Sequence, residues 1–355
     1  MKRIILVVLI PLLILFESYG QRKILNLPDL KGYVILKCDF HMHTVFSDGS
    51  VWPVYRIGEA YRDGLDAIAI TDHIEYSPYK DFVPVDQNAA WKIALPYAKA
   101  FNLILVHAAE ITRDMPPGHL NALFISDANG LVRDSAYDAI EAAVKQGAFI
   151  QWNHPGWKAQ EPDGIPKLYD LHRKLISNGW INGIEFFNDT EFYPLVLDWC
   201  IQYNIAVMGN SDIHGIISEE YKGPDWKNRP MTLVFAKERT AESLKEALFA
   251  GRTLVWFKDM LAGKEEYARQ FFNRSISIGK VYFESDKNRY FEITNKTDIP
   301  YYLVNGPVEA PEEIIIQANS ITRVVLSKKF QGPLVYDVKN VLTGSASVLR
   351  VELKY

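Results

Sequence analysis

The stretch YVILKCDFHMHTVFSDGS, residues 33–50, places an apolar run directly before His41 and His43. The run is short and ends in polar residues, which predicts a strand buried in the core of a sheet. Alternate residues of an extended chain project to the same face, so the two imidazoles can bind one metal ion together. The fold must then bring further ligands to the end of this strand.

Similar short apolar runs recur along the chain and alternate with helix-like segments. The runs are LDAIAIT, NLILVHAAE, LNALFI, AFIQWN, INGIEFF and IAVMGN. Helical spacing of apolar residues is found at 54–63, 89–101, 135–146 and 193–203, and AESLKEALFAGR is expected to be the final helix. Repeated strand-then-helix order predicts a parallel sheet, and about seven units favour closure into a barrel.

The sequence changes character after about residue 272. Segments such as SISIGKVYF, RYFEITNKT and SVLRVELKY alternate apolar and polar residues and are separated by turns. All eight histidines lie at or before His214, so this part carries little obvious chemistry. We therefore predict an α/β barrel domain over residues 21–271, followed by a small all-β sandwich over residues 272–355.

The first twenty residues form a separate segment. Two basic residues precede an unbroken apolar run over residues 4–16, and small residues stand just before Gln21. This pattern is typical of a secretory signal peptide, and the run is too short to span a bilayer comfortably. We expect residues 1–20 to be removed and the mature protein, without a membrane span, to be periplasmic or secreted; an uncleaved N-terminal anchor is the alternative.

Charge and cysteine content exclude some classes of site. A formal net charge of −4 gives no electrostatic reason to expect a specific nucleic-acid partner. Only Cys38 and Cys200 are present, both in apolar surroundings, and we expect buried free thiols and no thiolate metal site. A chain of 355 residues has a sufficient core and does not need a disulfide.

Metal-type ligands stand where the predicted strands end, and in a barrel the C-terminal ends of the strands share one rim. The candidates are His41, His43, His73, Glu110, His154, Asp212 and His214, with His119 at the start of the fourth strand. Imidazoles and carboxylates without thiolates suit Zn²⁺, Mn²⁺ or Fe, and a bridging carboxylate can hold two ions. We interpret these residues as one metal site, and His107 and His172 as structural.

The motifs HMHTVFSDG, TDH, AEIT, GHLNAL, NHP and SDIH stand in the order typical of the PHP family, named for polymerase and histidinol phosphatase. The sequence resembles this family over about residues 38–257. The export signal, the stretch NRPMTLVFA and the β-rich tail are similar to secreted bacterial PHP phosphodiesterases of the Sb-PDE type. The resemblance implies a distorted (β/α)₇ TIM-like barrel that holds two or three divalent ions.

The resemblance also implies three ligand sets, with Glu110 as a bridge between the first and the second. These sets are His41, His43, Glu110 and Asp212 for a first ion, Glu110, His119 and His154 for a second, and His73, His214 and Asp48 for a third. Some relatives have histidine where Asp48 stands. Asp and Gly are also common in turns for conformational reasons, so a role in the SDGS turn is the alternative for Asp48.

Supporting roles are predicted for three further residues. Asp72 precedes His73 and could orient it, with a strand-end cap as the alternative. Arg113 and Arg229 are candidates for clamping a phosphate, with a structural role as the alternative. Glu185 stands where the sixth strand is expected to end, but the resemblance assigns it no ligand role.

These features predict an enzyme, a phosphoric ester hydrolase in which a hydroxide that bridges two ions attacks phosphorus in line. A phosphodiester substrate is preferred because of the resemblance to secreted relatives. A phosphomonoesterase of the histidinol phosphatase kind, acting on a small phosphorylated molecule, is the alternative. An amidohydrolase-type hydrolase and a non-catalytic binding protein are further classes, but the Asp-x-His pair and the complete ligand set argue against them.

Overall fold

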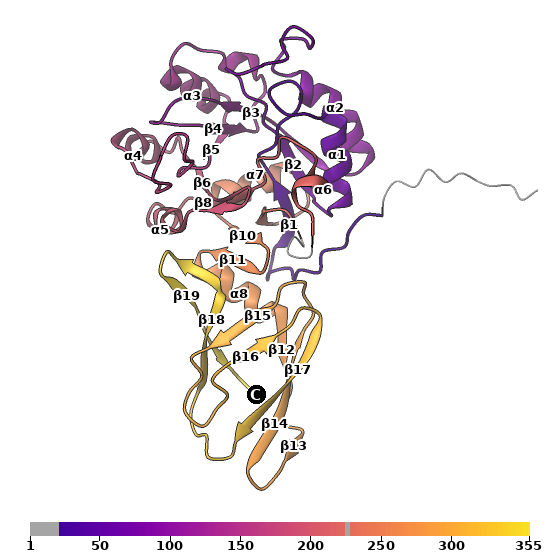
Figure 1. The fold of residues 1–355 in the computed structure, drawn as a ribbon, viewed down its shortest axis with the longest axis vertical. Helices are drawn as coiled ribbons and strands as arrows, with labels where there is room; N and C mark the ends of the chain where they lie inside the picture. The colour runs from indigo at the N-terminus through magenta and orange to yellow at the C-terminus, as the bar shows by residue number, and fades with distance from the viewer. Residues whose placement is uncertain (1–20, 224–227) are drawn as a thin grey trace, which may run out of the picture.

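The computed structural model describes residues 21–223 and 228–355. The chain forms an α/β barrel with an all-β domain packed at one end of it (Figure 1). The predicted signal peptide, residues 1–20, lies outside the described residues. In the part of the chain that is described, no helix is long and apolar enough to cross a membrane.

The barrel strands are mostly parallel, as predicted. The parallel strands are β1 (Val34–Asp39), β2 (Ala67–Ile70), β3 (Ile104–Ile111), β5 (Phe149–Trp152), β6 (Gly183–Asn188) and β8 (Ala206–Asn210). Strands β2 and β5 are buried throughout, as continuous apolar runs predict for a sheet covered on both faces. A parallel bridge between Met42 and Ile213 joins the chain beyond β1 to the chain beyond β8.

One strand departs from the predicted parallel order. β4 (Leu120–Leu123) runs antiparallel to both of its neighbours, β3 and β5. Because β4 is reversed, its first residue lies at the rim where the parallel strands end. His119, which directly precedes β4, is therefore brought to the same rim as the ligands that follow the other strands.

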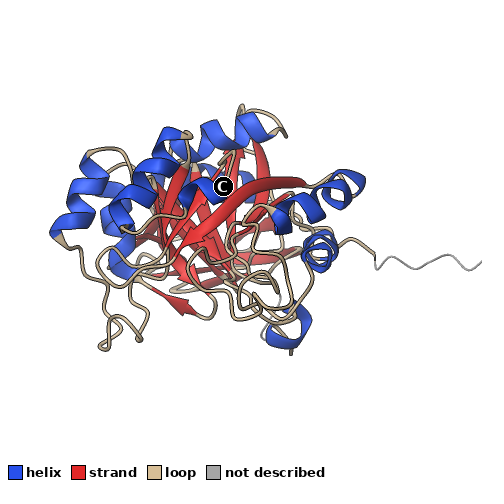
Figure 2. Ribbon diagram, turned by 90° about the horizontal axis from the view of Figure 1, so that it is seen from above, coloured by secondary structure: helices blue, strands red, loops and turns tan. Residues whose placement is uncertain are grey.

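The helices cover the outside of these strands (Figure 2). Four predicted helices are confirmed within one or two residues, namely α1 (Pro53–Arg62), α2 (Ala89–Ala100), α3 (Ala136–Lys145) and α5 (Pro194–Gln202). Ser135 caps α3 by accepting a hydrogen bond from the Asp138 N–H, which satisfies one of the free donors of the first turn. The short helices α4 (Asp170–Ser177) and α6 (Ile217–Glu220) were not predicted.

A single sheet continues from the barrel into the second domain. β9 (Met231–Ala236) pairs antiparallel with β1 and is followed in the sheet by β10 (Thr253–Phe257) and β11 (Met260–Gly263). β11 then pairs with β18 (Leu334–Gly344), with Leu261 opposite Val341. The two domains therefore share backbone hydrogen bonds as well as apolar contacts.

The prediction that residues 241–252 form the last helix is wrong. Helix α7 (Ala241–Phe249) is followed by α8 (Glu265–Ser275), which buries Ala268, Phe271 and Phe272. These apolar residues recur at helical spacing, so the pattern was present in the sequence. Helix α8 contacts β10 and β11 as well as β12 (Ile276–Ile278), β18 and β19 (Ser347–Leu353), and so packs between the two domains.

The C-terminal part forms the expected β-sandwich. One sheet contains β12 (Ile276–Ile278), β13 (Phe283–Glu284), β14 (Asn288–Asn295) and β17 (Ser320–Ser327). The other contains β15 (Tyr301–Val304), β16 (Ile314–Ile316), β18 and β19 (Ser347–Leu353). Burial alternates along β19, as the period of two in its sequence predicts. The domain boundary at residue 272 stays a prediction.

Candidate metal centre

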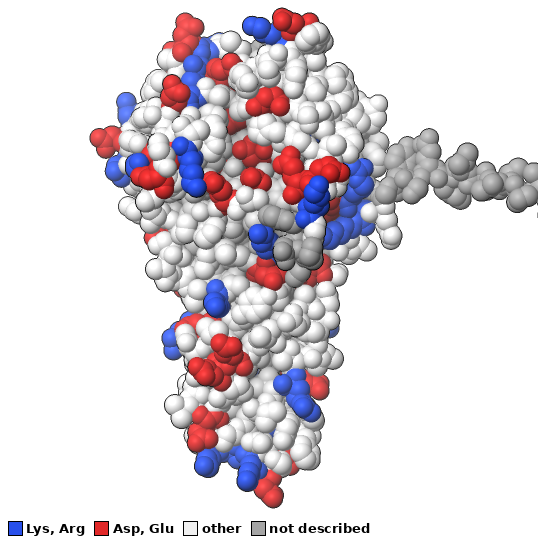
Figure 3. Space-filling model, in the orientation of Figure 1, with Lys and Arg blue, Asp and Glu red and all other residues white. Residues whose placement is uncertain are grey.

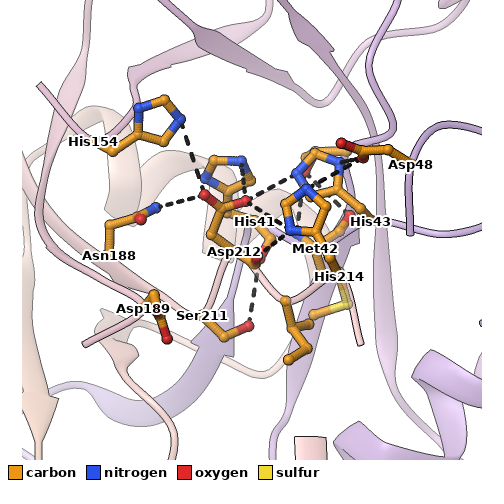
Figure 4. A network of polar contacts seen from close by, with 12 residues as sticks. His41, Met42, His43, Asp48, His154, Asn188, Asp189, Ser211, Asp212 and His214 are labelled. Carbon is orange, nitrogen blue, oxygen red and sulfur yellow. Dashed lines mark hydrogen bonds and ion pairs between the residues drawn. The ribbon is translucent and has the colours of Figure 1, made fainter. Parts of the chain in front are cut away.

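The nine predicted metal ligands lie in one cluster at the rim of the barrel. In the described chain their donor atoms meet in four overlapping groups, and the atoms within each group lie within 4.8 Å of one another. The groups are His43, Asp48, His73 and His214; His41, His43 and Asp212; His41, Glu110 and His154; and His73, Glu110 and His119. Figure 4 shows His41, His43, Asp212 and His214 gathered at the centre of this network.

The spacing of the donor atoms around His41 fits a divalent cation. Asp212 Oδ1 lies 3.1 Å from His41 Nε2 and 3.0 Å from His43 Nε2, and Glu110 Oε2 lies 3.5 Å from each of these nitrogens. Ligands bound tetrahedrally at about 2.0–2.1 Å from an ion would stand roughly 3.3 Å apart. The measured separations bracket that value. Of these residues, His41, His43 and Asp212 form one group of donor atoms close enough to share an ion, and Glu110 meets His41 in another group.

Two atoms of this group lack the partners that buried polar atoms normally have. His41 and Glu110 are both fully buried. Neither His41 Nε2 nor Glu110 Oε2 makes an aligned hydrogen bond, although His73 Nδ1 is only 2.8 Å from Glu110 Oε2. Buried polar atoms without partners are rare and costly, and a cation bound between these two would satisfy both.

Asp48 belongs both to a turn and to the cluster. Its Oδ1 atom lies 3.5 Å from His73 Nε2, 3.2 Å from His214 Nε2 and 3.8 Å from His43 Nδ1. The turn folds tightly against the histidine pair, since a Cβ atom on Gly49 would lie 2.5 Å from the backbone of His43. The glycine thus permits the close approach that presents Asp48 to the histidines, while ligation by Asp48 stays a prediction.

The histidines around Glu110 fall into groups that differ from the ligand sets implied by the resemblance. Glu110 Oε1 lies 3.0 Å from His119 Nδ1 and 3.8 Å from His154 Nε2. The groups of close donor atoms place His119 with His73, and His154 with His41. The resemblance instead implies that His119 and His154 bind the same ion. Glu110 is common to both groups, which suits a bridging carboxylate, and the assignment to individual ions stays a prediction.

Two ligands adopt a backbone conformation that is unusual outside glycine. His154, which follows β5, has φ 25°, and Asp212, which follows β8, has φ 50°. Such conformations cost on the order of 1–3 kcal/mol and persist only where surrounding contacts enforce them. The His154 N–H donates to Glu185 Oε2 at 2.7 Å, and the Asp212 N–H donates to the carbonyl of His41 at 2.9 Å.

Glu185 supports the cluster through a hydrogen bond with His41, a role that was not predicted from the sequence. His41 Nδ1 donates to Glu185 Oε1 at 2.9 Å, and the carboxylate is fully buried. Its further donors are the side chains of Gln151, Asn188 and Asn210. A carboxylate on Nδ1 fixes the ring so that Nε2 faces the cluster. Glu185 is the third residue of β6, and its place in an apolar run was the only signal in the sequence.

Asp72 supports a loop and does not orient His73, which corrects the prediction. Its carboxylate is buried and accepts hydrogen bonds from the Thr44 N–H at 2.6 Å, the Thr44 hydroxyl at 2.7 Å and the Ser47 hydroxyl at 2.8 Å. These residues lie between His43 and Asp48, so Asp72 positions the loop that carries both. His73 Nδ1 instead lies 2.6 Å from the Thr112 hydroxyl.

The two arginines predicted to clamp a phosphate are occupied elsewhere. Arg229, with a side chain only 1% exposed, binds Asp39 at 3.0 Å and Asp63 at 2.6 Å. Arg113 pairs with Glu75 at 2.8 Å. Among the hydrogen bonds and ion pairs of the described residues, none joins either arginine to the cluster, so the structure favours the structural alternative for both.

A third arginine, Arg56, joins the loop after His43 to the loop around His214. This role was not predicted from the sequence. It is fully buried on α1 and pairs with Glu59 at 2.7 Å. Its guanidinium donates to four backbone carbonyls, those of His43 at 2.9 Å, Ile213 at 3.0 Å, His214 at 3.0 Å and Gly215 at 2.7 Å. Nothing local in the sequence of α1 indicated the carbonyl partners, of which those of Ile213, His214 and Gly215 lie 157 to 159 positions away.

The charges of the cluster favour cation binding. Burial and the charge of His73 lower the pKa of His43 to about 3, which keeps its imidazole neutral. Burial would raise the pKa of Glu110, but His73 and His41 hold it well below its usual range. Burial would lower the pKa of His41, but Asp212, Glu185 and Glu110 raise it well above its usual range. A bound cation would replace such protons, so we expect proton release on binding.

Known proteins resemble both domains. A protein family described as an Ig-like domain matches residues 276–354. A crystal structure from Bacteroides vulgatus, of a two-domain protein containing a predicted PHP-like metal-dependent phosphoesterase, is 38% identical with a TM-score of 0.91. The match covers 95% of this chain and 99% of that chain. This chain belongs to the PHP-like family.

A second relative matches only a short segment of this PHP-like protein. An uncharacterized protein of Methanocaldococcus jannaschii is 46% identical over 48 residues, which is 14% of this chain. The match spans 22% of that protein. The family membership therefore rests on the full-length match, in which both domains are included.

Proposed function

We propose that this PHP-like protein is a metal-dependent phosphoesterase and that it hydrolyses phosphodiesters. The observation that carries the proposal is the convergence of imidazole and carboxylate atoms around the bridging candidate Glu110. When bound, two or three divalent ions (Mn, Zn or Fe) would activate a water and neutralise charge on the phosphoryl oxygens.

The residues of the chain would hold these ions and exclude bulk water from one side. His41, His43 and Glu110 are fully buried, whereas the side chains of Asp212 and His214 are 16% and 41% exposed. Substrate would therefore approach from the Asp212 and His214 side. In the reaction, a water gives up one proton and its oxygen forms a new bond to phosphorus, the bond to one ester oxygen breaks, and the departing alkoxide takes up a proton in place of the one released.

Two pockets beside the cluster favour a diester over a monoester. One pocket is lined by Asp212 and His214, and the other by Ile74 and Tyr76, which follow His73 in the chain. A diester carries two organic arms and a monoester only one. A site with space at two edges of the cluster suits the diester.

Activity of the purified protein on bis(4-nitrophenyl) phosphate and on 4-nitrophenyl phosphate tests this function. We expect hydrolysis of the diester in Mn²⁺, a smaller kcat/KM for the monoester, and loss of both activities after treatment with a chelator. Activity that survives complete metal removal would contradict the metal dependence, and a preference for the monoester would favour the phosphomonoesterase alternative.

We also propose that the protein is exported, on the basis of the basic, apolar and small-residue pattern of residues 1–20. N-terminal sequencing of the protein recovered from the periplasm or the medium should begin at Gln21. Recovery of an intact N-terminus in the membrane fraction would instead indicate an anchor.

A further inference from the structure

The pocket lined by Asp212 and His214 adjoins the cluster of nine predicted metal ligands. It has a volume of about 280 Å³, and its lining is Trp157, Asn188, Asp189, Thr190, Glu191, Asp212, His214 and Glu220. Two of these residues belong to the cluster, which fixes the end of the pocket where a phosphate would lie. The remaining lining would then meet one organic arm of the ester.

Three of the lining residues are the carboxylates Asp189, Glu191 and Glu220. Among the described residues, no lysine or arginine forms an ion pair with Asp189, Glu191 or Glu220. Each accepts a hydrogen bond from a neutral donor, namely the Tyr221 hydroxyl at 3.1 Å, the Tyr193 hydroxyl at 2.9 Å and the Gly215 N–H at 3.0 Å. On the barrel face drawn in Figure 3, several acidic side chains gather over its middle. The pocket therefore favours positive charge.

One feature of the pocket wall is independent of these carboxylates. Trp157 lines the pocket with a side chain 42% exposed, and its ring lies 5.3 Å from that of His154 and 5.5 Å from that of His119. An exposed indole face beside carboxylates is a suitable partner for an organic cation.

A metal ion is a poorer occupant of this outer pocket. In the described chain, Asp189, Glu191 and Glu220 belong to none of the groups whose donor atoms meet closely enough to hold an ion. Carboxylates that surround a pocket without converging on one point suit a charge spread over several atoms, as in a primary or quaternary ammonium group.

The second pocket differs in its charge. It has a volume of about 420 Å³ and is lined by Ile74, Tyr76, Val85 and Lys80, among others. Its one carboxylate, Glu75, pairs with Arg113 at 2.8 Å. An ammonium group would therefore be drawn to the pocket beside Asp212, and a neutral arm is better suited to the pocket beside His73.

We propose that the substrates are phosphodiesters in which one arm carries an ammonium group, bound in the pocket of Asp189, Glu191 and Glu220. This inference rests on the proposed phosphodiesterase function. An ammonium group placed among these carboxylates lowers KM for such diesters relative to diesters with a neutral arm of similar size. Added salt screens the attraction and reduces the preference.

The test compares glycerophosphoethanolamine and glycerophosphocholine with glycerophosphoglycerol, using the Mn²⁺-loaded protein and bis(4-nitrophenyl) phosphate as a reference. We expect kcat/KM to favour an ammonium-bearing diester by roughly tenfold, as expected for about one well-placed charge interaction. Glu191→Gln and Glu220→Gln should each reduce this ratio, mainly through KM. Glu219→Gln is the matched control, because Glu219 stands beside Glu220 on α6 but pairs with Lys222 at 3.4 Å, and it should keep the ratio.

The outcomes separate the inference from the function on which it rests. If the metal-loaded protein hydrolyses no phosphodiester, including the reference, both are overturned. If the reference is hydrolysed but the ratio is near one, or if both pocket variants keep the full ratio, only the ammonium-arm inference is overturned. Metal content equal to the wild type shows that the variants are correctly folded.

Discussion

Glu185 accepts a hydrogen bond from His41 Nδ1 at 2.9 Å, on the side of the ring that faces away from the cluster. The carboxylate thereby fixes which nitrogen of His41 is free to bind a cation. The two residues lie 144 positions apart, so only the closed barrel brings them together. The metal centre is thus oriented by residues that would not themselves bind a metal.

Replacing Glu185 with glutamine should weaken metal binding while preserving the fold. The amide keeps the size of the side chain but removes the charge that holds the His41 ring, and such changes commonly reduce metal affinity by roughly 10–100-fold. Isothermal titration with Mn²⁺ or Zn²⁺ measures this loss. The exposed variant Glu141→Gln serves as a control, and equal affinity in the two variants would disprove the orienting role.

Replacing Glu110 with alanine should remove two ions from each chain. Its two oxygens face different histidines, with His119 3.0 Å from Oε1 and His41 and His43 each 3.5 Å from Oε2. Asp48→Ala should remove one ion at most, because Asp48 belongs to a single one of the four groups of donor atoms. Elemental analysis of both proteins gives the stoichiometry, and a normal metal content in the Glu110 variant would refute the bridging assignment.

Replacing Arg56 with methionine should strongly destabilise the protein. The change leaves the buried carboxylate of Glu59 and four backbone carbonyls without their donor, and breaking a buried ion pair costs about 3–5 kcal/mol. Urea denaturation measures the free energy of unfolding. Arg62→Met, at the exposed end of the same helix, is the control; if both variants lose equal stability, the proposed role of Arg56 is wrong.

The buried His172 should make the free energy of unfolding depend on pH. It is fully buried, and its Nε2–H donates to the Pro117 carbonyl at 2.8 Å. Burial lowers its pKa from 6.5 to about 4, so the folded state holds it neutral where the unfolded chain would protonate it. Its contribution is therefore complete above about pH 6.5 and is lost as the pH falls from there to about 4, by roughly 3 kcal/mol.

Urea denaturation across this pH range tests that contribution. The variant His172→Gln lacks the titrating group, so its free energy of unfolding should fall less than that of the wild type between about pH 6.5 and 4. A wild type and a variant with the same slope would show that His172 does not set this dependence.

The sequence predicted most of the barrel and the members of the cluster because both depend on local patterns. Apolar runs identified the strands, and polar residues after each run identified the rim. The reversal of β4 could not be predicted in this way, since a short buried strand reads the same in either direction. His119 was nevertheless selected, because the resemblance to the PHP family assigns it to a ligand set.

The supporting residues were harder to predict because their partners lie far away in the sequence. Arg56 contacts carbonyls about 158 positions distant, and Arg229 forms its ion pair with Asp39 across 190 positions. Backbone carbonyls leave no side-chain signature, so nothing in the sequence around α1 indicates such a clamp. The roles of Asp72 and Glu185 likewise follow from the closed fold.

Anomalous diffraction from crystals soaked in Mn²⁺ tests the multi-metal centre most directly. The account predicts at least two anomalous peaks at the barrel rim, one between His41, His43, Glu110 and Asp212, and a second that also lies against Glu110. Crystals with full Mn²⁺ exposure that show no peak in this cluster, or peaks only at other places in the molecule, would contradict it.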